Sequence, residues 1–268
     1  MTDADELPTP HYRIDGYEPA NERIEDDFYL VTSSDTMFVP LADHHSTDGR
    51  HSYLVCYDAS AIWDLPGTAE YVAFHITRDI AQRTFTFDYA RHPVAALAQN
   101  WLIHEGCPPE AIELTDPNGP RPADALTTRL EDQLRANRDG RYTVIDHYTD
   151  NPASLDVGVE VRAFVHDSHP DSASAPYRLF LEETAKDLRS YTLREGAFAT
   201  AEAADDWAME RSSPLPLAPA PPSDAERRAQ AARARSTLKA PGLAAPPAPV
   251  APPRSPAPTA RHPRRGTP

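Results

Sequence analysis

The position of the last aromatic residue limits most strongly what this chain can fold into. Every Phe, Tyr and Trp lies at or before Trp207, and residues 212–268 are mostly Pro, Ala and Arg. A segment with so few large apolar side chains buries too little surface to offset the entropy lost on ordering. We therefore expect the fold to end near Arg211 and residues 212–268 to form a disordered tail.

The two parts of the chain also carry opposite charge. Residues 212–268 contain nine Lys and Arg and two acids, a net charge of +7, whereas residues 1–211 contain 17 basic and 39 acidic residues, a net charge of −22. Because such an acidic body repels phosphates, we expect nucleic acid to bind only through the tail, if at all.

Five basic residues of the tail are candidates for contacting a partner. They fall in a short Ala- and Arg-rich segment that opens with the spacing of a capping box. The candidates are Arg227, Arg228, Arg233, Arg235 and Lys239. Three interpretations remain open for them: an acidic macromolecular partner, nucleic acid, or solvent alone.

Cysteine content and hydropathy indicate the compartment. Cys56 and Cys107 form no CxxC motif and are too few for a disulfide framework, which favours a reducing environment. The first ten residues lack the apolar segment of a signal peptide, and no run approaches the ~18 apolar residues that cross a bilayer. We expect a soluble cytoplasmic protein that does not bind membranes.

Alternating apolar and polar residues predict antiparallel strands with one solvated face. Phe85, Phe87 and Tyr89, for example, alternate with polar residues. The predicted strands are residues 28–32, 37–41, 53–57, 71–77, 84–89, 142–148, 157–166, 177–183 and 191–194, with a short one at 12–14.

Helical spacing predicts the remaining elements. From Val94 to Leu102 apolar residues recur every three or four positions, and Gly106 and Pro108 then prevent continuation. Helices are predicted at residues 93–105, 109–114, 122–138 and 201–211. The chain is therefore expected to be α+β, with predominantly antiparallel sheet and about four packed helices.

The order of predicted elements is similar in the two halves of the body. We divide the chain into a polar lead-in (residues 1–27), an α+β lobe (28–116), a second α+β lobe (117–211) and the tail (212–268). The sequence leaves open whether the two lobes share one core.

Residues 43–51 contain the densest cluster of groups that can bind a metal. The candidates are Asp43, His44, His45, Asp48 and His51, whose imidazole and carboxylate groups suit Zn, Mn or Fe. Asp43-His44-His45 resembles the motif that names the DHH phosphoesterases, which implies a two-metal hydrolase. Those enzymes need further aspartate motifs on separate strands, and no Asp-x-Asp on a predicted strand precedes the motif here, so we assign no family. The alternative is a solvated turn rich in Asp, Ser and Gly.

Other signatures of chemistry are weak or absent from the sequence. There is no Gly-x-Ser-x-Gly nucleophile motif and no phosphate-binding glycine loop. Residues 166–171 form a second polar loop with two His. Glu182 and Glu183 are adjacent on a predicted strand and should face opposite sides, so they do not form a catalytic pair.

These observations favour a non-catalytic binding or accessory module without a cofactor, acting through its sheet face or its Arg-rich tail on an unknown partner. The first alternative is a metal-dependent hydrolase that uses the loop from Asp43 to His51 and a divalent metal. The second is a nucleic-acid accessory factor that binds through the tail.

Overall fold

The computed structural model describes residues 9–61, 67–114, 120–137, 140–151, 158–187, 189–218, 228–229 and 232–233. The described residues up to Ala218 belong to one compact unit, and the four that follow belong to a second unit. Most of the predicted tail therefore lies outside the described residues.

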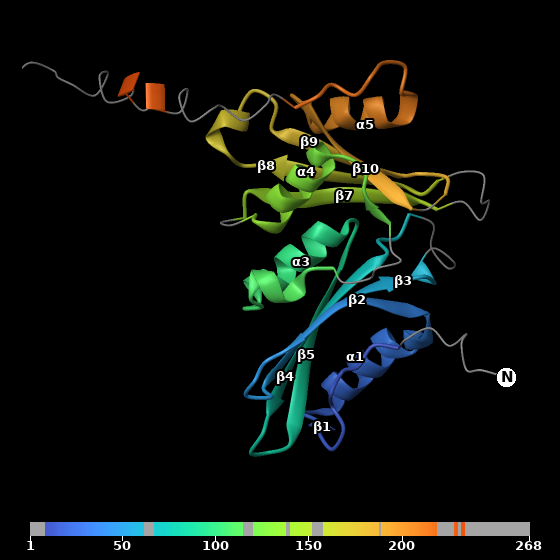
Figure 1. Cartoon of the computed structure of the whole chain (residues 1–268), viewed down its shortest axis with the longest axis vertical. Coiled ribbons are helices and arrows are strands. Elements are labelled where there is room, and N and C mark those ends of the chain that lie inside the picture. The colour runs from blue at the N-terminus through green and yellow to red at the C-terminus, as the bar shows by residue number, and fades with distance from the viewer. Residues whose placement is uncertain are drawn as a thin grey trace, which may run out of the picture. The chain divides into compact units, whose positions relative to one another are not determined.

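The described body is α+β, as the sequence predicts, and consists of two lobes with the same order of elements (Figure 1). Lobe 1 contains β1 (Glu18–Pro19), α1 (Glu22–Thr32), β2 (Phe38–His45), β3 (His51–Asp58), β4 (Tyr71–Asp79), β5 (Thr84–His92) and α3 (Ala95–His104). Lobe 2 contains β6 (Arg121–Pro122), α4 (Ala125–Arg135), β7 (Tyr142–Asp150), β8 (Glu160–Asp167), β9 (Tyr177–Thr184), β10 (Ser190–Phe198) and α5 (Ala201–Glu210). The 3₁₀ turns are η1 (Asp35–Met37), η2 (Pro109–Ile112) and η3 (Pro170–Ser172).

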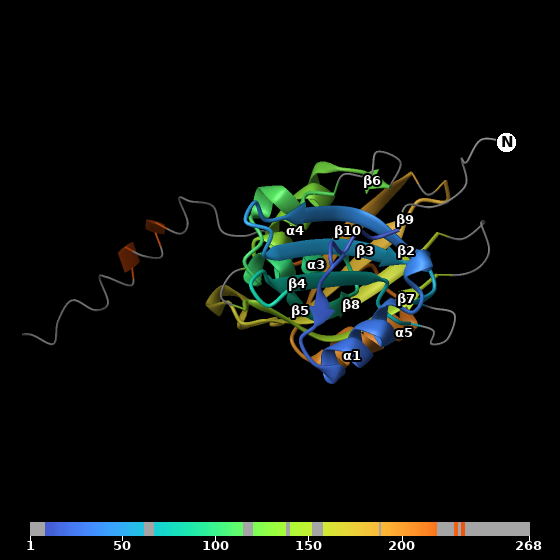
Figure 2. The ribbon, with the colours of Figure 1, turned by 90° about the horizontal axis from the view of Figure 1, so that it is seen from below.

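Each lobe contains one five-stranded sheet. Sheet A has the order β1-β5-β4-β3-β2, which Figure 2 shows side by side from β5 to β2, and sheet B has the order β6-β10-β9-β8-β7. Four strands of each sheet form an antiparallel meander, and the two-residue strand pairs in parallel with the last strand. Residues 46–50 connect β2 to β3, residues 80–83 connect β4 to β5, and the polar loop that the sequence analysis finds at residues 166–171 begins at the end of β8.

The two lobes match in their backbone hydrogen bonds. In lobe 1 the N–H of Ala20 donates to Phe85 O at 2.9 Å, and in lobe 2 the N–H of Ala123 donates to Tyr191 O at 2.8 Å. The N-cap residues of α1 and α4 are 103 positions apart (21 and 124), and the first residues of β5 and β10 are 106 apart (84 and 190). The lobes are therefore a structural duplication whose equivalent positions can be compared directly.

The first helix replaces a strand that the sequence analysis predicts. Residues 28–32 belong to α1, so the strand prediction there is wrong. The side chain of Asn21 caps the helix by accepting from the N–H of Ile24 at 3.1 Å. Ile24, Phe28 and Val31 lie at helical spacing and pack against sheet A. The apolar run therefore covers the sheet as a helix face rather than joining it as a strand.

Helix α3 belongs to the cores of both lobes (Figure 1). Its residues Ala98 and Leu102 pack with Val55 and Ala73 of sheet A. At the other side, Leu97 packs in a cluster with α4 and the facing side of sheet B. Helices α1 and α5 cover the outer sides of sheets A and B. The lobes thus share an apolar interface through one buried helix.

The ordered chain continues past Arg211, the predicted end of the fold. The indole N–H of Trp207 donates to Ser213 O at 2.9 Å, and residues 216–218 pair with the outer edge of β10. Leu215 packs on the cluster beneath α5, close to Gly196, where no side chain intervenes. Residues 213–218 therefore belong to lobe 2. No helix among the described residues is long and apolar enough to cross a membrane.

Candidate ligand-binding site

The predicted metal loop is a β-hairpin. Asp43, His44 and His45 end β2, His51 begins β3, and Asp48 lies in the turn between them. The carboxylate of Asp48 accepts from Ser46 Oγ at 2.6 Å and from the N–H of Arg50 at 3.0 Å. These bonds are those of an Asp-containing turn, the structural alternative that the sequence left open.

The five metal candidates in the hairpin contact different residues and do not converge on one point. Asp43 Oδ2 lies 2.9 Å from Nε2 of His45, whereas Nδ1 of His51 lies 3.1 Å from Nε2 of His75 on β4. His44 stacks on Tyr53 instead. Within the part of the chain that the structure describes, no three His, Cys, Asp or Glu side chains are arranged to hold a metal ion. The hydrolase alternative stays a prediction that this geometry does not support.

His45 also contacts a serine, which gives an Asp–His–Ser order that the sequence analysis did not find. Nδ1 of His45 lies 2.6 Å from Oγ of Ser52. However, Ser52 is fully buried, and Arg78 donates to its hydroxyl at 2.5 Å. Arg78 also donates to the carbonyls of Tyr12 and Gly49. The network therefore ties the N-terminal segment to the hairpin and offers a substrate no exposed nucleophile.

The second polar loop, at residues 166–171, has a structural role. Asp167 is buried and pairs with Arg141 at 2.7 Å and with Arg178 at 3.6 Å. Burial alone would raise the pKa of Asp167, but hydrogen bonds from Arg141 and Ser172 outweigh it and lower the pKa to about 2. Among the described residues no hydrogen bond or ion pair joins this loop to the hairpin at 43–51.

The cysteines and the described part of the tail contribute no reactive group. Cys56 and Cys107 are free and buried, and burial raises the pKa of each thiol to about 12. Of the five basic tail candidates, Arg228 and Arg233 are described, both exposed and helical. The other three lie outside the described residues, and the role of all five stays a prediction.

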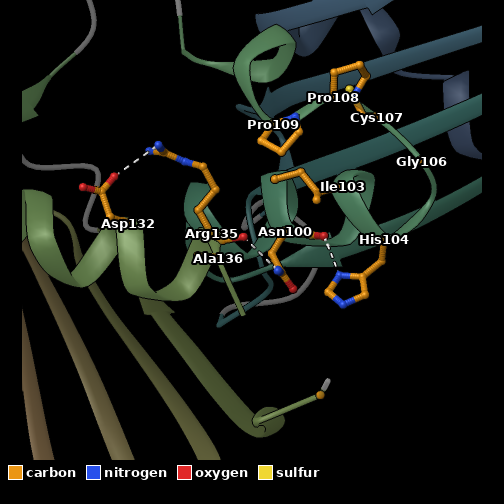
Figure 3. A pocket seen from close by; sticks show the side chains of 11 residues that line it. Asn100, Ile103, His104, Gly106, Cys107, Pro108, Pro109, Asp132, Arg135 and Ala136 are labelled. Atoms are coloured by element: carbon orange, nitrogen blue, oxygen red, sulfur yellow. Dashed lines mark hydrogen bonds and ion pairs between the residues drawn. The ribbon is translucent and has the colours of Figure 1, made fainter. Parts of the chain in front are cut away.

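A hollow of about 1060 Å³ lies between the C-terminal ends of α3 and α4 (Figure 3). Its polar groups are already paired with one another. Asn100 donates to the carbonyls of Arg135 and Asn137, the Arg135 guanidinium bonds Asp132, and His104 bonds the carbonyl of Asn100. This surface therefore has few groups left to recognise a ligand.

A smaller cavity of about 350 Å³ lies between the two lobes and has a different chemistry. Its apolar wall comes from both lobes and includes Val39 and Leu41 of β2 and Val161 of β8. Its polar side chains are three carboxylates, three phenols, an amide and a hydroxyl, from Glu70, Glu131, Glu182, Tyr57, Tyr71, Tyr191, Asn151 and Thr184. Ala95, the first residue of α3, also lines it.

Glu182 is the most unusual of these groups. It lies on β9 and is 9% exposed, and no described residue donates a hydrogen bond to its carboxylate. Burial, followed by the charges of Glu131 and Glu70, raises its pKa from 4.5 to about 8. Its carboxylate oxygens are not among the fully buried atoms that lack a hydrogen-bond partner, so they face the cavity. A largely buried carboxyl with no protein partner is a candidate for function.

The two other carboxylates have partners within the cavity wall. Glu131 on α4 accepts a hydrogen bond from the hydroxyl of Tyr191. Glu70, which precedes β4, accepts from Nδ2 of Asn151 at 2.8 Å and bonds the hydroxyl of Tyr57. Burial raises the pKa of both glutamates. The three acids therefore converge on one enclosed space from α4, β9 and the approach to β4.

In lobe 1, apolar side chains occupy the positions that are equivalent to those of three of the cavity-lining residues in lobe 2. At three pairs of equivalent positions, an apolar side chain in lobe 1 corresponds to a polar side chain that lines the cavity in lobe 2: Phe28 and Glu131, Ile76 and Glu182, Phe85 and Tyr191. In lobe 1 the rings of Phe28 and Phe85 pack edge to face at 5.3 Å, whereas in lobe 2 Tyr191 donates to Glu131. Lobe 2 thus has polar groups where lobe 1 has a packed apolar core.

The sequence analysis correctly separates Glu182 from Glu183, since Glu183 is exposed, but does not recognise Glu182 as a site residue. The available signal is alternation along β9. Phe180 is fully buried, and Glu182 two residues later must face the same side. An acid in such a row predicts a buried carboxyl.

Comparisons of this chain with protein-family models, with curated proteins and with solved structures found no match.

Proposed function

We propose that this chain is a binding module that holds a small molecule in the cavity between its two lobes. The observation that carries the proposal is the convergence of polar groups from both lobes on one cavity with an apolar wall. Ligand sites in proteins are typically cavities of ~300–1,000 Å³ at domain interfaces, with apolar walls and a few placed polar groups. The cavity of about 350 Å³ has this composition.

Binding rather than covalent catalysis is favoured by the residues of the wall. Among the described residues, no Cys, Ser, His or Lys side chain lines the cavity. The acids Glu70 and Glu131 are held by neighbouring side chains, so their orientations are fixed before a ligand arrives. The proposal keeps the binding-module interpretation of the sequence and assigns the interaction to a sheet face rather than to the tail.

A cavity-filling variant tests the proposal. Ala95 and Ala125 are the first residues of α3 and α4, but only Ala95 lines the cavity, whereas Ala125 is exposed. Purified full-length protein is screened against small molecules by thermal shift and calorimetry. We expect compounds that stabilise the wild type to stabilise Ala125→Phe equally and to lose binding to Ala95→Phe. Equal binding to both variants would place the site elsewhere and contradict the proposal.

A further inference from the structure

We propose that the ligand of the inter-lobe cavity is a small organic cation, an amine or quaternary ammonium with an apolar body, and that Glu182 is its counterion. The inference rests on the proposed function, because it names the class of molecule that the cavity takes.

The first argument is charge. Three carboxylates face the cavity, and no Lys or Arg lines it among the described residues. Arg135, whose charge reaches Glu131, is engaged by Asp132 and by Gln99, which do not line the cavity. An anionic ligand would be repelled by the three acids, and a neutral ligand could hydrogen-bond only the protonated form of Glu182. A cation is the ligand that stabilises the charged form of Glu182 in this largely buried position.

The second argument is size. The three acids are not arranged to hold one metal ion, since no group of three His, Cys, Asp or Glu among the described residues is suitable. The apolar wall formed by Val39, Leu41 and Val161 also offers nothing to a hydrated ion. A cation that fills the space must therefore carry its charge on an apolar framework.

The third argument is the aromatic lining. The rings of Tyr57 and Tyr71 meet edge to face with centroids 5.9 Å apart, and both line the cavity with Tyr191. Ring faces attract ammonium groups, and quaternary ammonium ligands are commonly held by aromatic residues beside an acid. The wall therefore offers a cation both an ion pair and aromatic contacts.

Binding of a cation should be coupled to release of a proton. The groups that face Glu182 are Glu131 from α4, Glu70 before β4, and the phenols of Tyr71 and Tyr191. With a pKa of about 8, Glu182 is mostly protonated at neutral pH in the empty cavity. A bound cation stabilises the carboxylate, so the affinity for a permanent cation should rise with pH up to about 8 and then level off.

Matched pairs of probes test the inference in the full-length protein. Choline and 3,3-dimethylbutan-1-ol have the same shape and differ only in the charged nitrogen, and larger ammonium compounds are paired with carbon isosteres in the same way. Affinities are measured by calorimetry between pH 6 and pH 9. We expect the cations to bind about tenfold or more tightly than their isosteres, a difference of about 1.4 kcal/mol.

Two variants connect the preference to one residue. Glu182→Gln should reduce the affinity for the cations about tenfold and abolish its rise with pH, because the counterion is gone. Glu183→Gln, on the opposite side of the same strand, should change neither. Equal affinity for charged and neutral partners, or an unchanged preference in Glu182→Gln, would overturn the inference.

The outcomes also separate this inference from the proposed function. If neutral isosteres bind as well as cations and Ala95→Phe abolishes both, the cavity is a ligand site but not a cation site. If neither cations nor isosteres bind the wild type, the cation inference fails, and the screen with Ala95→Phe and Ala125→Phe decides the proposed function separately.

Discussion

Glu182 is the most unusual of the polar side chains that distinguish the interior of lobe 2 from that of lobe 1. Its equivalent, Ile76, is fully buried in the apolar core of lobe 1. Replacing an apolar side chain by a carboxyl that lacks a partner removes hydrophobic stabilisation and adds a desolvation cost. Lobe 2 keeps this destabilising carboxyl in its interior. Destabilising groups of this kind are common at functional sites and rare elsewhere.

The pH dependence of stability should show that cost. The pKa of Glu182 is raised from 4.5 to about 8 in the folded protein, so stability is lost as the pH rises through this interval. Glu182→Gln has no titratable carboxyl at this position, so the variant should not lose stability over this pH interval. We expect the variant to be more stable than the wild type at pH 8 by about 2–4 kcal/mol, below the upper limit of about 5 kcal/mol set by the full shift. Chemical denaturation at pH 4 and pH 8 measures the gain, which should vanish at pH 4. A gain of the same size at both pH values would refute the assignment.

Asp167 illustrates the opposite case, a buried carboxylate with full compensation. Asp167→Ala leaves the guanidinium groups of Arg141 and Arg178 without their partner, and we expect it to cost about 3–5 kcal/mol. Asp171→Ala, in the same loop but half exposed, should cost less than about 1 kcal/mol. Urea denaturation compares the two. Similar small losses would mean that the buried network does not form.

At the scale of elements, local pattern predicts most of the fold. The meander strands lie where alternation places them, and α5 lies within the helix predicted at residues 201–211. The failure at residues 28–32 has a physical cause, since a short apolar run suits a strand or a helix equally. The information that decides it lies earlier, in the Asn21 cap and the acidic first turn.

The strand-like segment after α5 was also beyond prediction, because its partner is the edge of β10. Leu215 packs against lobe 2, whereas Leu217 two residues later is 68% exposed. We expect Leu215→Asp to lower the melting temperature by several degrees, equivalent to about 2 kcal/mol, and Leu217→Asp to leave it unchanged. A thermal melt in which both variants match the wild type would show that residues 213–218 do not pack on the sheet.

At the scale of the whole molecule, α3 makes the stability of the two lobes interdependent. Leu97 contributes to the core of lobe 2, and Leu102 to the core beneath sheet A. We expect Leu97→Ala and Leu102→Ala each to cost about 2–5 kcal/mol. Hydrogen exchange should show that each variant weakens protection in the strands of both sheets. Loss confined to one lobe would indicate independent unfolding.

The candidate site could not be predicted from local sequence pattern, because its residues come together only through that packing. Glu70, Glu131 and Glu182 are each separated by about 50–60 positions and lie on elements of different lobes. The cluster at 43–51 attracts attention because its residues are adjacent in sequence, yet its side chains form turn and ring contacts. Proximity along the chain and proximity in space therefore point to different residues in this protein.

The protonation state of Glu182 is the most direct test of this account. Infrared difference spectroscopy of the ligand-free wild type against Glu182→Gln reports the carbonyl stretch of a protonated carboxyl group, with Glu183→Gln as the control. We predict that the wild type shows this band at pH 6 and loses it at around pH 8. Absence of the band at pH 6, or its loss near the ordinary pKa of a glutamate, would contradict the claim that Glu182 is buried without a protein partner in the cavity between the lobes and is protonated there at neutral pH.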